Sequence, residues 1–316
     1  MKKEDLRIVF LGTPEFAVES LEAIHNGNYN IVAIVTMPDK PAGRGHKLLQ
    51  SPVKLWGVEH NIPVLQPVNL KDPEFVNELK GYNANLFIVI AFRMLPEVVW
   101  KMPELGTFNL HASLLPRYRG AAPINRAIMN GDTTTGVTTF FLKHEIDTGD
   151  IISQEAIEIG EDEDAGSLHD RLMTLGARLT LDTLDRIIKE DLQPIPQEQL
   201  LTNGEEPTPA PKIFREDCRI DWKKTAKQVK DFVRGLSPYP AAWATMAFPG
   251  LGNVDTKIFQ VKISDDRSSL LPGNMKIKGN SIVVGTGEGN IEIQSLGVPG
   301  KKRMDVAAFL NGLQNH

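Results

Sequence analysis

The chain has 316 residues, more than one ordinary domain holds, so its length predicts two compact domains. Its single cysteine, Cys218, excludes an intramolecular disulfide and a cysteine-based zinc cluster. The formal net charge of -5 argues against a protein that coats nucleic acid, although it leaves room for a local basic patch. The apolar run 6–11 is too short for a signal peptide or a membrane span, so we expect a cytoplasmic protein without a membrane segment.

The first half of the chain alternates short apolar runs with helical patterns. Continuous apolar runs are typical of strands in a parallel sheet, because crossover helices cover both faces of such a sheet. The predicted strands are 6–11, 31–36, 86–91, 107–111, 136–142 and 151–159. A long amphipathic helix is predicted over 167–189. This order predicts an α/β fold with a Rossmann-like, mostly parallel sheet and flanking helices.

Three helix starts in this half share a side-chain oxygen followed by proline. They are Thr13-Pro14, Ser51-Pro52 and Asp72-Pro73. An oxygen at this position accepts a hydrogen bond from a free backbone N–H of the first turn, and proline suits the first helical position. We therefore expect these residues to cap three helices.

The composition changes after the long helix. Residues 193–212 carry five prolines among polar side chains, which is typical of a linker between domains. Beyond the linker, helices are predicted near 225–236 and 304–312. The predicted strands between them are 257–263, 274–277, 281–284 and 290–294. We predict an N-terminal catalytic domain over 1–191, a linker over 192–210 and a small C-terminal β-barrel domain over 211–316.

The turn after the first strand bears on nucleotide binding. A dinucleotide-binding Rossmann domain requires the pattern G-x-G-x-x-G at this place. Here Gly12 is followed by Pro14 and Ala17 at the positions of the second and third glycines. The sequence therefore disfavours a dinucleotide cofactor, and a tight strand-to-helix turn accounts for Gly12.

Asn109 and His111 carry the first candidate chemistry. If 107–111 is a strand, both side chains point to the same face, because side chains alternate along a strand. An amide that donates to an oxyanion and an imidazole that either exchanges a proton or donates likewise form a useful pair for acyl transfer. A histidine on a strand is also common as a structural residue, so the pair alone leaves both interpretations open.

Asp147 is the third candidate, on a loop beyond the strand 136–142. Open α/β sheets place their ligand sites at such strand ends, and a carboxylate close to His111 would fix the orientation of the ring. The sequence Asp147-Thr148-Gly149 is equally typical of a simple turn. Spacing does not choose between a site and a turn, and no set of residues predicts a metal centre.

Two longer motifs favour a catalytic site over a structural role for these residues, because they resemble a known family. The segment NLHASLLPRYRGAAPI at 109–124, followed by DTGDI at 147–151, closely resembles the folate-dependent formyltransferases. Other segments are similar to members of that family whose acceptor is methionyl-tRNA. They are VFLGTPEFA at 9–17, PDKPAGRGHKL at 38–48, RIDW at 219–222 and GKKRM at 300–304. The resemblance spans essentially the whole chain.

The resemblance implies an enzyme that transfers a formyl group from 10-formyltetrahydrofolate to the α-amino group of initiator methionyl-tRNA, for translation initiation. The family's catalytic residues are matched by Asn109, His111 and Asp147. The segment that holds the folate is matched by Ser113, Leu114, Leu115 and Pro116. The folate is a consumed co-substrate, and no metal is implied.

The basic loop at 38–48 is implied to reach the acceptor end of the tRNA. Arg44 matches the family's key contact, and Lys40 and Lys47 add positive charge within a Gly- and Pro-rich stretch. The C-terminal domain resembles an oligonucleotide-binding (OB) barrel that supports the acceptor arm. A second basic cluster, 301–303, is a further candidate for phosphate contact, and we expect the protein to be a monomer.

The chain departs from the family pattern at two places. Ala91-Phe92-Arg93 stands where members often have Ala-Tyr-Gly, which puts an arginine near the pterin end of the folate site. Lys143-His144-Glu145 stands where many have an acid and a glycine, which brings a second histidine near Asp147. His111 is preferred over His144, because its neighbours match the motif on both sides.

Three other functions remain as alternatives. A formyltransferase for a small amine, such as a glycinamide ribonucleotide or an amino sugar nucleotide, needs neither a basic loop nor a C-terminal barrel. A tRNA-binding protein without catalysis does not need Asn109, His111 and Asp147 together. A formyl-folate hydrolase would turn over without an acceptor.

Overall fold

The computed structural model describes residues 1–42, 47–201, 206–266 and 270–314, and they fall into two compact units. The first unit comprises Met1–Gly120, Gly136–Ile157 and His169–Pro209. The second comprises Ala121–Thr135, Glu158–Leu168 and Ala210–His316. The domain limits at 191 and 211 stay a prediction. Among the described residues, no helix combines the length and apolar character needed to cross a membrane.

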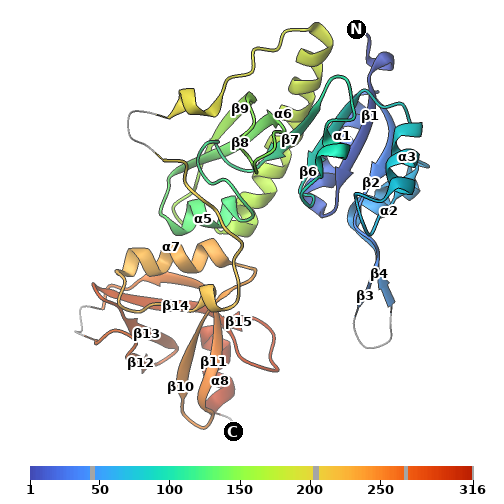
Figure 1. Cartoon of the computed structure of the whole chain (residues 1–316). Coiled ribbons are helices and arrows are strands. Elements are labelled where there is room, and N and C mark those ends of the chain that lie inside the picture. Colours follow the sequence, from blue (N-terminus) through green and yellow to red (C-terminus); the bar gives the residue numbers. More distant parts are fainter. Residues whose placement is uncertain (43–46, 202–205, 267–269, 315–316) are drawn as a thin grey trace. The chain divides into compact units, whose positions relative to one another are not determined.

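The first unit is built on a seven-stranded sheet in the order β5-β2-β1-β6-β7-β8-β9 (Figure 1). The strands are β1 (Arg7–Gly12), β2 (Asn30–Val35), β5 (Val64–Leu65), β6 (Leu86–Ile90), β7 (Thr107–His111), β8 (Thr134–Phe141) and β9 (Ile151–Glu158). From β5 to β7 neighbouring strands are parallel, and β8 runs antiparallel to β7. The predicted mostly parallel, Rossmann-like sheet is confirmed.

The helices of this unit are α1 (Glu15–Asn26), α2 (Pro52–Glu59), α3 (Pro73–Gly81), α4 (Glu97–Trp100) and α6 (Ala165–Lys189). Two of the three predicted caps are confirmed: Ser51 accepts a hydrogen bond from Lys54 N, and Asp72 accepts one from Glu74 N. The predicted cap at Thr13 is wrong. Pro14 occupies the capping position of α1, one residue later than expected, and the Thr13 hydroxyl is buried without a hydrogen-bond partner among the described residues.

The register of the sheet decides which face carries the candidate residues. Val9 pairs with Phe87 and Val89 pairs with Asn109, so these side chains share one face. Val9, Phe87 and Val89 belong to an apolar cluster that includes residues of α3 and α4. Asn109, and by strand alternation His111, therefore lie on the face that α3 and α4 cover.

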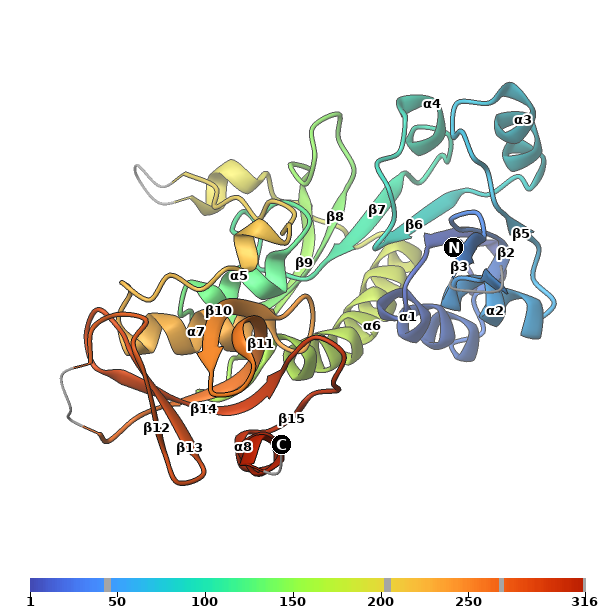
Figure 2. The ribbon, with the colours of Figure 1, turned by 90° about the horizontal axis from the view of Figure 1, so that it is seen from below.

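The opposite face of the sheet packs against α6. Leu110 points to this face, and a Cβ built on Gly176 of α6 would lie 2.6 Å from Leu110 Cδ2. A glycine at this position lets the helix approach β7 closely. The ring of Phe16 on α1 contacts that of His169 on α6, with centroids 5.1 Å apart, so α1 and α6 share this side (Figure 2).

Two short paired strands lie within and beside the stretch predicted as a loop at 38–48. β3 (Lys40–Ala42) pairs antiparallel with β4 (Lys47–Leu49). The sequence analysis expected a basic loop here and did not predict this strand pair, which flanks residues 43–46, outside the described residues. The side chain of Gln66 donates to Met37 O at 2.9 Å and to Asp39 Oδ1 at 2.7 Å, which holds the base of the hairpin.

The second unit contains a six-stranded antiparallel sheet, curled as a half-barrel. Its strands are β10 (Ala242–Phe248), β11 (Gly252–Ile263), β12 (Met275–Lys278), β13 (Ser281–Gly285), β14 (Asn290–Gly297) and β15 (Met304–Asp305), and its helices are α5 (Pro123–Met129), α7 (Ala226–Leu236) and α8 (Val306–Gln314). Buried Val229 and Val233 of α7 join the apolar core of this sheet. The predicted small β-rich C-terminal domain is confirmed, although β10 was not predicted.

Candidate active site

His111 lies at the carboxyl end of β7 and is buried, with 7% of its surface exposed. Its Nε2 is 2.9 Å from the carbonyl oxygen of Tyr118. Because a carbonyl oxygen only accepts, Nε2 carries the proton of this hydrogen bond. Nδ1 lies 3.8 Å from Oδ2 of Asp147, too far for a hydrogen bond but close enough for an ion pair once the ring is protonated. The fold thus brings together two residues that lie 36 positions apart in the sequence.

Asp147 is held from two sides in the loop between β8 and β9. Its backbone is left-handed, with φ of 54°, a conformation that aspartate adopts more readily than most residues. Its Oδ2 accepts a hydrogen bond from Gly120 N at 2.9 Å. Two residues on, a Cβ built on Gly149 would lie 1.5 Å from the carbonyl oxygen of Phe141, so the loop closes only with glycine there.

Asn109 is half-buried on the same face of β7 as His111. Its backbone is fixed between β6 and β8, where it pairs with Val89 and Phe140. Within the described residues its side-chain amide makes no hydrogen bond. The amide is therefore available to donate to a ligand beside His111.

The segment 113–116 is held by hydrogen bonds to Arg117 and to Thr138 of β8. The Ser113 hydroxyl is buried and donates to Arg117 O at 2.7 Å. Thr138 Oγ1 donates to Ser113 O at 2.6 Å and accepts from Leu115 N at 3.1 Å. Leu115 and Pro116 are buried and Leu114 is half-buried. The predicted folate segment is therefore well packed where it follows the carboxyl end of β7.

Two of the three predicted tRNA contacts lie on the paired strands β3 and β4. Lys40 is exposed on β3 and Lys47 begins β4, whereas Arg44 lies outside the described residues. In the second unit, Lys301 and Lys302 are exposed. Arg303 is engaged with its surroundings, because its Nε donates to Ser295 Oγ at 3.0 Å.

Both departures from the family pattern have a structural account. The guanidinium of Arg93 donates to Val68 O at 2.8 Å and to Pro67 O, and burial lowers its pKa from the ordinary value. The positively charged guanidinium is therefore already hydrogen-bonded to two backbone carbonyl groups of the preceding segment. His144 is exposed, whereas His111 is buried beside Asp147, which favours His111 as the histidine of the site.

Sequence reasoning missed several groups that build this site. The Tyr118 carbonyl and the Gly120 N–H are backbone groups, which no residue type reveals. Gln197, in the 3-10 helix η2 (Gln197–Leu200), is fully buried and hydrogen-bonded to the Asp147 loop. Its only sequence signal was a polar residue inside a proline-rich stretch, which predicts an exposed linker instead.

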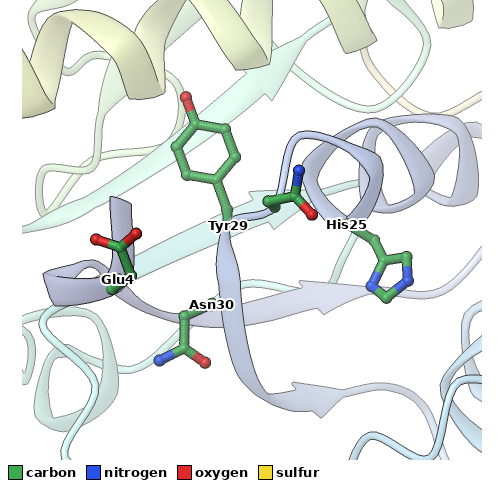
Figure 3. Close-up of a pocket in the computed structure, with 5 residues that line it drawn as sticks. Glu4, His25, Tyr29 and Asn30 are labelled. Atoms are coloured by element: carbon green, nitrogen blue, oxygen red, sulfur yellow. The ribbon is translucent and has the colours of Figure 1, made fainter. Parts of the chain in front are cut away.

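A separate pocket of about 390 Å³ lies at the start of β2 (Figure 3). Its lining residues are Glu4, His25, Asn28, Tyr29 and Asn30, none of which is a predicted site residue. Tyr29 reaches toward α6, where its hydroxyl donates to Asp185; burial and this bond raise the pKa of the phenol. In the part of the chain that the structure describes, no group of three or more His, Cys, Asp or Glu side chains is placed to hold a metal ion.

The chain belongs to the formyl transferase family. The model of the formyl transferase domain matches residues 6–184, and that of the formyl transferase C-terminal domain matches residues 212–314. The predicted resemblance to folate-dependent formyltransferases is thereby confirmed.

Two similar proteins narrow the family assignment to the methionyl-tRNA formyltransferases. A methionyl-tRNA formyltransferase of Bacteroides fragilis is 55% identical over 99% of this chain and 96% of its own length. One from Porphyromonas gingivalis is 50% identical over 99% of this chain and 97% of its own length.

Two solved structures share the fold at low identity. HypX from Aquifex aeolicus, in complex with tetrahydrofolic acid, has a TM-score of 0.64 and 20% identity over 98% of this chain. The chain spans about half of HypX, 47% of its length. WlaRD, a sugar 3N-formyl transferase, has a TM-score of 0.63 and 19% identity over 94% of this chain and 99% of its own length.

Proposed function

We propose that this enzyme transfers the formyl group of 10-formyltetrahydrofolate to the α-amino group of initiator methionyl-tRNA. The observation that supports the proposal is that His111, at the carboxyl end of β7, lies 3.8 Å from Asp147 and shares a face of the strand with Asn109, in a chain 50–55% identical to methionyl-tRNA formyltransferases. Ligands of open α/β sheets bind at this edge. Acting on initiator tRNA, the protein would work in the cytoplasm, as a monomer, in translation initiation.

The reaction needs an oxyanion donor and a proton acceptor. The neutral amine attacks the formyl carbon, and the carbonyl oxygen becomes an oxyanion. When the tetrahedral intermediate collapses, the bond from carbon to N10 of the folate breaks, the folate nitrogen takes a proton, and the amine has lost one. The side-chain amide of Asn109, which has no partner among the described residues, donates to the oxyanion.

His111 is suited to the proton transfer. Its Nε2 proton is committed to Tyr118 O, so Nδ1 is the nitrogen with a free lone pair. When Nδ1 takes the proton from the amine, the carboxylate of Asp147 at 3.8 Å stabilises the positive charge on the ring. The same proton can then be passed to the leaving folate nitrogen.

The remaining proposed contacts divide between folate and tRNA. We assign the folate contacts of this segment to Ser113, Leu114, Leu115 and Pro116; the Ser113 hydroxyl donates to Arg117 O, which leaves its oxygen able to accept a hydrogen bond. Lys40 and Lys47, on β3 and β4, and Arg44, which lies outside the described residues, are assigned contacts with phosphates at the acceptor end.

Folate turnover with three acceptor conditions tests the function. The reaction is followed with methionyl-tRNA, with deacylated tRNA and with no acceptor. Turnover only with methionyl-tRNA, releasing formylmethionine after ester hydrolysis, is the expected result. Turnover without an acceptor would indicate a hydrolase, and turnover only after adding an amino sugar nucleotide or a glycinamide ribonucleotide would indicate a small-amine enzyme.

A further inference from the structure

Gln197 is a fully buried amide at the centre of a hydrogen-bond network in the first unit. Its Nε2 donates to two backbone carbonyls, Asp147 O at 2.9 Å and Gly149 O at 2.8 Å. Its Oε1 accepts two bonds from one guanidinium, from Arg119 Nε at 3.0 Å and from Arg119 Nη2 at 2.7 Å. The two N–H donors and the two lone pairs of the amide are all used.

This pattern fixes the orientation of the amide. If the amide were flipped, its NH₂ would face the guanidinium and its oxygen would face two carbonyl oxygens, so four attractive contacts would become repulsive. Because the Gln197 side chain is fixed by four hydrogen bonds, it also restricts the positions of the groups to which it is bonded. Those groups belong to two different loops of the candidate active site.

Each of those loops supplies one partner of His111. The loop that contains Arg119 also contains the carbonyl of Tyr118, which accepts from His111 Nε2. The other loop contains Asp147, whose Oδ2 lies near His111 Nδ1. Tyr118 and Asp147 both have left-handed backbones, with φ of 63° and 54°. Such conformations are costly for residues other than glycine and persist only where surrounding contacts enforce them.

The chain around Gln197 is itself held against these loops. Ile195 and Ile151 exchange two backbone hydrogen bonds, of 2.8 and 2.9 Å. On the other side, Arg119 N donates to Thr208 O at 3.0 Å. The stretch predicted as a linker therefore supports the Asp147 loop directly.

We propose that Gln197 is a positioning residue for the reaction, acting through Asp147 and His111 while touching neither substrate. This inference rests on the proposed catalytic roles of those two residues. Displacing a reacting group by about 1 Å costs on the order of 10²-fold in rate. Gln197→Leu, which removes all four bonds, should therefore lower kcat by about 10²-fold and leave the KM for methionyl-tRNA nearly unchanged, because the tRNA contacts are assigned to the hairpin.

The discriminating experiment is a double-mutant cycle with Asp147→Asn, measured as kcat for formyl transfer. If Gln197 acts through Asp147, Gln197→Leu costs far less in the Asp147→Asn background than in the wild-type enzyme. Gln197→Glu is the second variant. It keeps the size of the side chain and the acceptor for Arg119, but places a carboxylate oxygen against two carbonyls, so its kcat should fall at least as far.

Asn85→Leu is the matched control, because the Asn85 amide also bonds two backbone groups, Arg7 N and Asp5 O, at the opposite end of the sheet. It should lower the melting temperature without a specific loss of kcat. The inference is overturned if both Gln197 variants keep wild-type kcat, or if they lose kcat by the same factor in both backgrounds. An Asp147→Asn enzyme as active as wild type would refute the proposed role of Asp147 and the inference with it, whereas an impaired Asp147→Asn beside fully active Gln197 variants overturns only the inference.

Discussion

Replacement of Asn109 by alanine separates catalysis from folding. The backbone of Asn109 is paired on both sides in the sheet, and alanine keeps both pairings. Its half-buried amide makes no hydrogen bond within the described residues, so the change removes little that stabilises the fold. We expect a change of no more than about 1 kcal/mol in the free energy of unfolding, because asparagine and alanine are both poor strand formers. A domain stable by about 5–15 kcal/mol stays almost entirely folded after such a loss.

The expected effect on the reaction is much larger. Removing one donor to an oxyanion typically costs about 3–4 kcal/mol of transition-state stabilisation, or 10²–10³ in kcat. Because the donor acts in the transition state, the KM values for folate and methionyl-tRNA should change little. The measurement is steady-state formylation of methionyl-tRNA at saturating folate, with a thermal melt of each variant.

Two further variants sharpen this experiment. Asn109→Asp has almost the same size but presents a carboxylate to the oxyanion, so it should lose at least as much activity as Asn109→Ala. Asn26→Ala removes an amide on α1 whose hydrogen-bond partner among the described residues is Glu22, and it should keep full activity. A stable Asn109→Ala enzyme with wild-type kcat would refute the role proposed for Asn109.

Three more predictions concern the loop, the fold and the hairpin. Gly149→Ala would place a Cβ 1.5 Å from a carbonyl oxygen of β8, so we expect a loss of about 2–3 kcal/mol in unfolding free energy and of most formylation activity, by melting and assay. The indole N–H of Trp56 holds the pKa of Glu22 below its ordinary 4.5. The ionised Glu22 carboxylate should stabilise the fold fully above pH 4.5. This stabilisation should disappear as the pH falls through the lowered pKa of Glu22 in the folded protein, so the melting temperatures of wild type and Glu22→Gln should converge in acid. Neutralising Lys40 and Lys47 should weaken methionyl-tRNA binding and reduce the slope of log K against log salt by about 0.7–0.9 per lost contact; unchanged slopes would exclude them as phosphate contacts.

Local patterns predicted much of the first unit because β1 and β6, at the centre of its sheet, are buried on both faces. The bounds of β7 agree with the structure at both ends, and Asn109 and His111 follow from them. β10 was missed for a physical reason. Its buried positions alternate correctly, but three of its seven residues are alanines, which have low strand preference, and so the periodic signal is weak.

The candidate site was only partly predictable for a different reason. The chemistry of their side chains made Asn109, His111 and Asp147 recognisable as candidates in the sequence. The distance between His111 and Asp147, in contrast, depends on how two loops close. The groups that close them are backbone atoms, a glycine required by a nearby carbonyl and Gln197 in a proline-rich stretch. These contacts join residues that are far apart in the chain, and no pattern of period two or 3.6 records them.

The hydrogen bond from His111 to Tyr118 also bears on which side chain binds the oxyanion and which one transfers the proton. A histidine that served as the oxyanion donor through Nε2 would have to give up its hydrogen bond to the Tyr118 carbonyl, a bond that typically contributes about 0.5–1.5 kcal/mol. Keeping that bond leaves Nδ1 as the only nitrogen for proton exchange, and Nδ1 is the one that faces Asp147. The amide of Asn109 makes no competing bond within the described residues and needs no rearrangement to donate. The geometry therefore favours Asn109 for the oxyanion and His111 with Asp147 for the proton.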